Sequence, residues 1–401
     1  MVMFSKYFYQ VVQFKSCIDI CHAEPNHNCF RTVYENFSTT IGGCAVFVLP
    51  LSLLPIVMKA RHLNADVLKQ SMRLFMDSFV GAWLISGAGL SMMCFYRRLL
   101  GRFYYPTVLA LPSATAAAIC QPLLSDRAIY TYAHGLSAIA LQISITRGDF
   151  YILRILRNSR IAITLAFMYL NMLLMQGMKE NDFGRFYWLT EPLKRKADFH
   201  EFYEPSRLMD QLTPVVRSQI KCCEHAKSCD EYIWSGVCRF LKVSLCVEII
   251  RNIIFSYNLI FRNPWKIIRE RFNWNLILFL VGYVGTYRFV NCLTSRHNIY
   301  LREEHSKTGH QLASILSGIS FYFYPNIAVL SYAATTIIEI YWIKYYNQMK
   351  LISNWIPLYK IKMIIFPIVF AYVLHVRAFT PWLAPSMLKK LMHLTTNYKY
   401  K

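Results

Sequence analysis

Two groups of cysteine and histidine residues lie ahead of apolar stretches of the chain, about 200 residues apart. They contain Cys21, His22, His27 and Cys29 in the first group, and Cys222, Cys223, His225 and Cys229 in the second. Zinc takes about four sulfur or nitrogen donors in a tetrahedron, and each group has enough donors to supply two or more. The spacing is not that of a standard zinc finger. Three interpretations therefore stay open: a metal site with zinc as its cofactor, disulfides, or thiols that remain reduced or carry lipid.

Ionisable residues inside the apolar stretches form the second set of candidates. They are Asp77, His134, Glu248, Arg288, Glu339 and His375. A charge in hydrocarbon is costly unless it is paired or faces a polar cavity, so each residue is a candidate for function. We predict that Arg288 and Glu339, which have opposite charges, form a polar pair that lines a pathway. A structural ion pair, or a side chain that reaches the membrane surface, would explain the same residues.

Catalytic motifs are missing from the sequence. It contains no Walker loop, dinucleotide fingerprint, Gly-x-Ser-x-Gly elbow or His-Glu-x-x-His pair. Its 11 histidines are scattered, whereas a desaturating or acyl-modifying site needs histidines clustered at helical spacing. We therefore predict that the protein is not an enzyme.

The elements that must position these residues are long apolar runs. The chain of 401 residues is 55% hydrophobic and only 16% charged, which is more apolar than a soluble fold. Runs near the roughly 20 residues that cross hydrocarbon cover residues 41–58, 74–96, 106–123, 128–145, 161–175, 240–260, 276–293, 311–324, 327–342 and 361–375. Several runs are short or broken by proline, so the sequence predicts an all-α, multi-pass transmembrane protein of about eight to ten spans.

The charge balance indicates the partner of these runs. The chain has 44 Lys and Arg residues against 22 Asp and Glu residues, a net charge of +22. The basic residues punctuate the apolar runs, whereas a nucleic-acid binder would gather them on one polar face. We therefore predict a lipid bilayer as the partner and no nucleic acid.

The second half of the chain matches the first after a shift of about 200 residues. The aligned residues include Cys29 with Cys229, and, after a slip of two residues, Gly87 with Gly285 and Cys94 with Cys292. The apolar runs also fall into register, five against five. The sequence therefore predicts two tandem repeats of about five helices, residues 1–178 and 222–401, joined by a polar linker over residues 179–221.

The number of spans in each repeat determines whether the two repeats have the same or opposite orientation in the membrane. Five spans each would insert the second repeat upside down and place a pathway at the midplane between the repeats. Four spans each, with the runs at 161–175 and 361–375 lying at the membrane surface, would leave the repeats parallel. We favour five.

Small residues gather in three of the runs. Among them are Gly81, Gly87 and Gly89 in the second run, and Ser317 and Gly318 in the eighth. Small side chains let helix backbones approach closely in lipid, where apolar contact alone brings no hydrophobic gain. We interpret these residues as sites of helix packing.

Several short motifs are distinctive when they are taken together. They are the stretch from Arg97 to Tyr104, Leu111-Pro112, Arg147-Gly148, Tyr287-Arg288, Cys292, Arg296, the stretch from Ser317 to Ser320, Tyr324 and Glu339. These motifs resemble those of the transmembrane protein 135 family. The paired cysteine segments look like the cysteine-rich region of that family. The resemblance extends from about residue 17 to residue 376.

This resemblance implies a multi-pass protein of peroxisomal and mitochondrial membranes, distantly similar to the inner-membrane translocase and peroxisomal membrane protein group. It also implies a role in the balance of mitochondrial fission and fusion through dynamin-related fission machinery, in peroxisome organisation and in lipid metabolism. The family supplies no catalytic residues. We therefore expect a non-enzymatic organelle membrane protein.

Two other functions are compatible with the sequence. The repeats could form a carrier or channel for a lipid or metabolite, with Arg288 and Glu339 along its path. An insect-type chemoreceptor has a comparable length and spans rich in tyrosine and phenylalanine, but its seven helices are not repeated. Counting the spans would distinguish the receptor from the other two.

Overall fold

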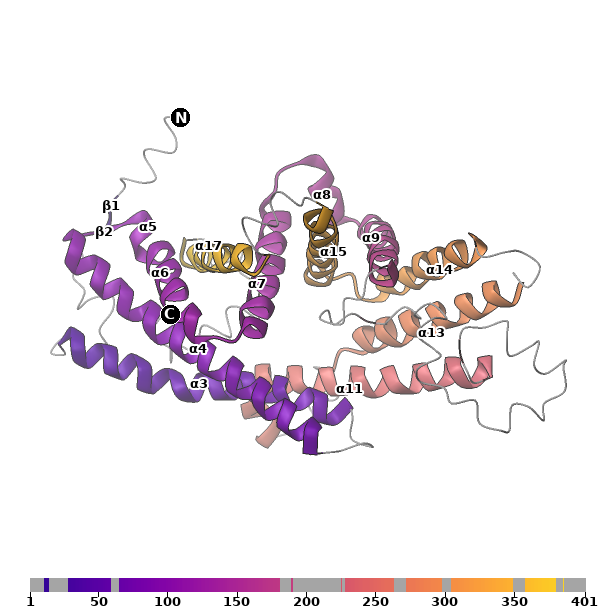
Figure 1. The fold of residues 1–401 in the computed structure, drawn as a ribbon, viewed down its shortest axis with the longest axis horizontal. Coiled ribbons are helices and arrows are strands. Elements are labelled where there is room, and N and C mark those ends of the chain that lie inside the picture. The colour runs from indigo at the N-terminus through magenta and orange to yellow at the C-terminus, as the bar shows by residue number, and fades with distance from the viewer. Residues whose placement is uncertain are drawn as a thin grey trace. The chain divides into compact units, whose positions relative to one another are not determined.

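The structure is a computed structural model, which describes residues 11–13, 28–58, 65–180, 189, 225, 228–262, 272–297, 304–348, 358–379 and 385. Almost all of these residues are helical, so the predicted helical class is confirmed (Figure 1). The exception is a short antiparallel pair, β1 (Val11–Gln13) and β2 (Phe103–Tyr104), in which Val11 lies opposite Tyr104.

Four helices in the described part of the chain are long and apolar enough to cross a membrane. The segments are Ser71–Leu100, Arg160–Glu180, Trp274–Ser295 and Ile327–Tyr346, and Ile361–Val376 is a shorter apolar helix. These five segments coincide with five of the predicted runs. The chain therefore has the helices of a membrane protein, while the larger predicted number of spans stays a prediction.

The ends of these helices follow from local charge and backbone chemistry. The helix α4 (Ala65–Leu100) has Asp66 in its first turn and Arg97 and Arg98 in its last, which suits the helix dipole at both ends. Gly101 follows with φ of +72°, a left-handed conformation that ends helices and that glycine adopts without strain. The Arg97 guanidinium donates a hydrogen bond to the Gly101 carbonyl oxygen.

The chain forms two compact units, which are described separately. Unit 1 comprises Met1–Arg147, Ile250–Arg262 and Met349–Lys401, and unit 2 comprises Gly148–Ile249 and Asn263–Gln348. Each unit thus combines segments from both halves of the sequence.

Unit 1 contains helices from the start and the end of the chain. These are α3 (Cys29–Met58), α4, α5 (Tyr105–Val108), α6 (Ala110–Cys120), the 3-10 helix η2 (Gln121–Leu123), α7 (Asp126–Arg147) and α17 (Leu358–Phe379). The helix α4 packs against both α3 and α6, and α17 packs against α6 and α7 (Figure 1). An apolar cluster of Ala117, Ile129, Ala133 and Phe366 lies where α17 meets α6 and α7.

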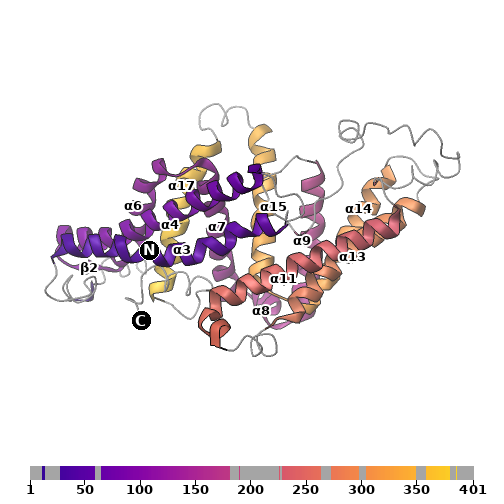
Figure 2. The same cartoon turned by 90° about the horizontal axis from the view of Figure 1, so that it is seen from below.

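Unit 2 contains the middle of the chain. Its elements are α8 (Tyr151–Asn158), α9 (Arg160–Glu180), the first part of α11 (Cys229–Arg262), α13 (Trp274–His297), α14 (Glu304–Ser317), the 3-10 helix η6 (Gly318–Phe323) and α15 (Ile327–Gln348). The helix α9 packs against α14, η6 and α15, and α13 packs against α14 and η6 (Figure 2). Four almost fully buried rings, Phe167, Phe279, Tyr283 and Phe321, form the centre of this unit.

Each of the helices α9 and α17 packs against helices from the half of the sequence to which it does not itself belong. The helix α9 comes from the first half of the chain and packs on α14 and α15, which come from the second half. Conversely, α17 comes from the second half and packs on α6 and α7, which come from the first half. The sequence did not predict this arrangement.

Candidate functional site

Three of the cysteine and histidine side chains meet in unit 2. The donor atoms of His225, Cys229 and Cys292 all lie within 4.8 Å of one another. The closest described approach is 3.2 Å, between His225 Nε2 and Cys292 Sγ. His225 and Cys292 are buried, and Cys229 is half-buried. We call these three residues the His-Cys-Cys cluster.

Helix pairing brings the cluster together. Cys229 is the first residue of α11, and His225 precedes it by four positions. Cys292 lies close to the end of the candidate span Trp274–Ser295, on α13. A close approach at Gly285, where an added Cβ would lie 3.3 Å from the Val237 side chain, packs α11 against α13. The start of α11 therefore meets the end of α13.

An aromatic and cationic contact borders the cluster. The His225 ring stacks on the Tyr232 ring, with 4.3 Å between centroids and 12° between planes. The guanidinium carbon of Arg288 lies 4.2 Å from the centre of the same ring, and Arg288 Nη1 donates to the Tyr232 carbonyl oxygen at 2.6 Å. Gly236 leaves the room for Arg288, because a Cβ there would lie 2.5 Å from Arg288 Nε. These contacts hold the imidazole plane through Tyr232.

The cluster unites part of the second predicted cysteine group with a residue outside it. Cys21, His22, His27, Cys222 and Cys223 lie outside the described residues, and Cys29 is the exposed first residue of α3. The metal prediction did not include Cys292, which lies far along the chain from His225. Its alignment with Cys94 in the shifted sequence was a signal that could have singled it out.

The structure does not bring Arg288 and Glu339 together. Arg288 contacts Tyr232 and Ser235, and no ion pair joins it to Glu339 in the part of the chain that the structure describes. Helical phase explains this, since Arg288 lies on the side of α13 that faces α11. Whether either residue lines a pathway stays a prediction.

Glu248 has a structural explanation for its burial. Its Oε1 accepts a hydrogen bond of 2.9 Å from the backbone N–H of Asn273, the residue before α13. The Asn273 side chain in turn accepts a hydrogen bond of 3.2 Å from the backbone N–H of Leu276. The start of a helix carries partial positive charge, which stabilises a carboxylate there. Glu248 therefore binds the start of a neighbouring helix.

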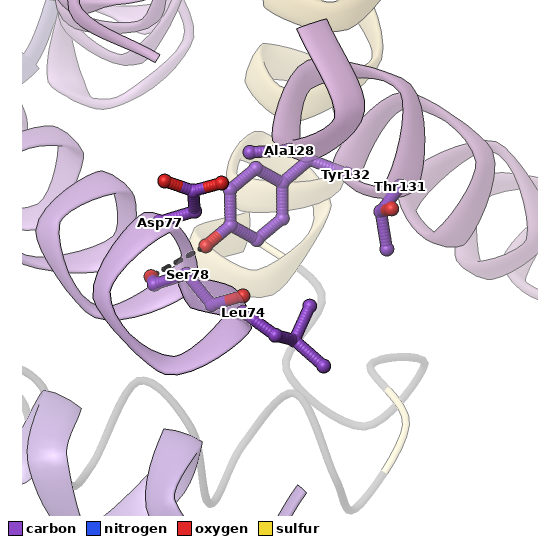
Figure 3. Close-up of a pocket in the computed structure, with 6 residues that line it drawn as sticks. All are labelled: Leu74, Asp77, Ser78, Ala128, Thr131 and Tyr132. Atoms are coloured by element: carbon purple, nitrogen blue, oxygen red, sulfur yellow. Dashed lines mark hydrogen bonds between the residues drawn. The ribbon is translucent and has the colours of Figure 1, made fainter. Parts of the chain in front are cut away.

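Asp77 lies beside a small pocket in unit 1 (Figure 3). Leu74, Asp77 and Ser78 of α4 and Ala128, Thr131 and Tyr132 of α7 line this pocket. The Asp77 carboxylate accepts a hydrogen bond of 2.9 Å from the Ser125 hydroxyl, and the Tyr132 hydroxyl donates to the Ser78 carbonyl oxygen at 2.6 Å. The pocket is thus lined by one carboxylate, Asp77 in a candidate span, and by three residues with hydroxyl groups, Ser78, Thr131 and Tyr132.

The two remaining ionisable candidates lie on helices of unit 1. His134 is buried on α7, and His375 is half-buried on α17. Neither residue belongs to the pocket or to the His-Cys-Cys cluster.

The fold and these sites together define a class, a helical protein with helices long and apolar enough to cross a membrane and a cluster of histidine and cysteine side chains, of the types that bind metals, at the end of one of them. No family model and no solved structure matches the chain. The resemblance to the transmembrane protein 135 family accordingly stays a prediction.

Proposed function

We propose that this protein is a multi-pass membrane protein made of two repeats that exchange their fifth helices. The observation that carries the proposal is the reciprocal packing of α9 and α17. Numbered within the repeats, α6 corresponds to α14, α7 to α15 and α9 to α17. The fifth helix of each repeat then packs on the third and fourth helices of the other.

Local features support the same correspondence. Both α7 and α15 have 22 residues, and each follows a 3-10 helix after a shorter α-helix. The Gly87 position of α4 meets the Phe37 ring of α3, while Gly285 of α13 meets Val237 of α11. These two contacts involve positions that the shift of about 200 residues aligns with each other. A contact repeated at aligned positions favours common architecture over chance.

We further propose that the protein acts in mitochondrial and peroxisomal membranes without catalysing a reaction. Its role there would be to influence the balance of fission and fusion together with dynamin-related machinery, peroxisome organisation and lipid metabolism. The resemblance to the transmembrane protein 135 family supports this role. Residues that carry the resemblance also hold unit 2 together: Ser317 accepts a hydrogen bond from Asn171, and Gly318 lies against the Met168 backbone.

Localisation and loss of function test the proposed role. We expect a tagged chain to resist alkaline carbonate extraction and to co-localise with mitochondrial and peroxisomal markers. Its deletion should change mitochondrial length and peroxisome number, and re-expression should restore both. Release of the chain by carbonate, or staining of the plasma membrane alone, would contradict the role, and the latter would favour a receptor.

A second candidate function, a carrier or channel for a lipid or metabolite, has one specific observation in its favour. The Asp77 carboxylate lies in a candidate span and borders a pocket, where a charge is costly without a polar function. Purified protein in liposomes should then move a fluorescent phospholipid or a small anion. Asp77→Asn should slow this movement, and Glu339→Gln should do so if Glu339 also lines the path. Liposomes that move neither probe would remove this candidate.

A further inference from the structure

We propose that His225, Cys229 and Cys292 bind one zinc ion that fastens the start of α11 to the end of α13. This inference is independent of the proposed function, because neither the two repeats nor the organelle role requires a metal. The proposal identifies a binding site, its ligands and the class of ion.

The distances in the cluster suit a single ion. Zinc binds sulfur at about 2.3 Å and imidazole nitrogen at about 2.0 to 2.1 Å in a tetrahedron. Two ligands of one zinc therefore lie roughly 3.5 to 3.8 Å apart, and never beyond about 4.6 Å, by the same bond lengths. The three donor atoms here lie within 4.8 Å of one another, and one pair lies at 3.2 Å. Changes of at most about 1 Å in these separations place all three donors on one ion.

The chemistry of the donors selects zinc. Two thiols and one imidazole are borderline-soft ligands, which prefer zinc to magnesium or calcium. As thiolates, the two cysteines would balance the double positive charge of the ion while the imidazole stays neutral. A neutral complex avoids the cost of a buried net charge. Three protein ligands leave one position of the tetrahedron for a fourth donor or for water.

The surroundings prepare the histidine for this role. Stacking on Tyr232 fixes the plane of the His225 ring, and Arg288 holds Tyr232 through its ring and its carbonyl oxygen. Neighbouring residues that orient a metal-binding imidazole strengthen metal binding, because the side chain then loses less conformational freedom when the ion binds. Tyr232 and Arg288 are therefore positioning residues for the site.

The zinc would stabilise a helix pair that spans a large part of the sequence. His225 and Cys229 lie at the start of α11, whereas Cys292 lies more than 60 residues later on α13. An ion that binds only the folded arrangement adds its binding free energy to the stability of this pair. Zinc loss would thus loosen α11 from α13 and leave the helices themselves intact.

The first experiment measures bound metal in the full chain, purified in detergent with a reductant. We expect Cys229→Ser, Cys292→Ser and His225→Ala each to contain about one zinc per chain fewer than the wild type, by elemental mass spectrometry. Cys238→Ser and Cys246→Ser are matched controls, because both cysteines lie on α11 outside the cluster. Comparison with these controls also cancels any zinc held elsewhere in the chain. Equal zinc in cluster and control variants would overturn the proposal.

A second measurement on the wild-type chain keeps the test decisive if a cluster variant does not fold. Cobalt(II) added to metal-stripped protein should give the thiolate-to-cobalt charge-transfer band and the intense visible bands of a tetrahedral site. Zinc should remove these bands and raise the melting temperature. The absence of cobalt bands, or a disulfide between Cys229 and Cys292 found by peptide mass spectrometry in unreduced protein, would contradict a zinc site.

Discussion

The helices α9 and α17 have equivalent places in the two proposed repeats, but different chemistry fastens them. In unit 2, α9 is held by hydrogen bonds of the buried Asn171 side chain, in addition to apolar contacts such as the stacking of Phe167 on Phe321. In unit 1, α17 packs through apolar side chains, among them Phe366, Val373 and Val376. Lipid tails are as apolar as these side chains, so burying them in a membrane brings little hydrophobic gain. The packing of α9 therefore adds a polar network to apolar contacts, whereas the clusters that hold α17 are apolar.

The polar interface centres on Asn171. Its amide nitrogen donates to the Ser314 carbonyl oxygen at 2.6 Å and to the Ser317 hydroxyl at 3.2 Å. Its amide oxygen accepts a hydrogen bond of 2.7 Å from the Tyr283 hydroxyl. One side chain on α9 thus binds both α13 and α14, and its removal takes one hydrogen-bond partner from each of three buried polar groups.

The apolar interface depends on small residues. Phe366 is 1% exposed and packs with Ala117 of α6 and Ala133 of α7, both fully or nearly fully buried. Val373 lies against Ile143 of α7. Alanine lets the backbones approach, so dispersion contacts become numerous. This interface should tolerate conservative changes better than the polar one.

The largest loss of stability should follow Gly318→Ala, where α9 approaches η6 most closely. An added Cβ would lie 2.8 Å from the Met168 Cα, a backbone atom that cannot move aside cheaply. We expect a loss of about 3 kcal/mol, at the upper end of overpacking effects. Thermal unfolding in detergent measures it, with Gly135→Ala as the control because nothing lies within 4 Å of a Cβ there. Equal melting temperatures for the two variants would contradict the close contact.

Asn171→Leu should have the next largest effect. The substitution keeps the number and branching of the side-chain heavy atoms but leaves the Tyr283 hydroxyl and the Ser317 hydroxyl without this partner, at a cost of about 2 kcal/mol. Unfolding in detergent again gives the measurement. Tyr169→Phe on the exposed side of α9 is the matched control and should change little. A stability equal to that of the wild type would show that the polar network does not hold α9.

Val373→Ala tests the apolar side of the comparison. We expect a loss of about 1 kcal/mol in the free energy of unfolding, smaller than at Asn171. The methyl groups of Val373 contact Ile143 in the folded protein and lipid or detergent in the unfolded protein, so their removal costs little. Ile368→Val, at an exposed position of the same helix, serves as the control. If Val373→Ala destabilised the protein more than Asn171→Leu, the distinction between the two interfaces would be wrong.

Gly236→Ala should have the smallest effect on stability but a visible one at the His-Cys-Cys cluster. The new Cβ would displace the Arg288 guanidinium, a flexible group, at a cost of roughly 0.5 to 1 kcal/mol. Arg288 would then lose its contact with Tyr232, so cobalt binding at the cluster should weaken several-fold. Gly42→Ala, in open space on α3, provides the comparison and should leave cobalt affinity unchanged.

Sequence patterns predicted the local elements well and the pairings between them poorly. Apolar runs located the candidate spans, since length and hydropathy are local properties. The grouping of His225 with Cys229 was also local, as four residues separate them. Cys292 joins them only because α11 pairs with α13. The opposite charges of Arg288 and Glu339 suggested a contact, but helical phase directs Arg288 to Tyr232 instead.

The sequence could not predict the proposed exchange of α9 and α17, for a physical reason. Repeats present similar surfaces, so a fifth helix can pack on the third and fourth helices of either copy. Residues such as Asn171 and Ser317 differ from their counterparts in the other copy and favour one pairing. Their match becomes visible only when the helices are seen side by side.

Cysteine cross-linking tests the exchange most directly. Gly177 lies against Ile340, where an added Cβ would be 2.9 Å from the Ile340 side chain. The account predicts that Gly177→Cys with Ile340→Cys forms a disulfide, identified by mass spectrometry of the linked peptide, in the full chain in membranes. Without exchange, α9 would pack on α7, and Gly177→Cys would instead link to Ala140→Cys, the position that corresponds to Ile340. A disulfide of the second pair alone would contradict the account.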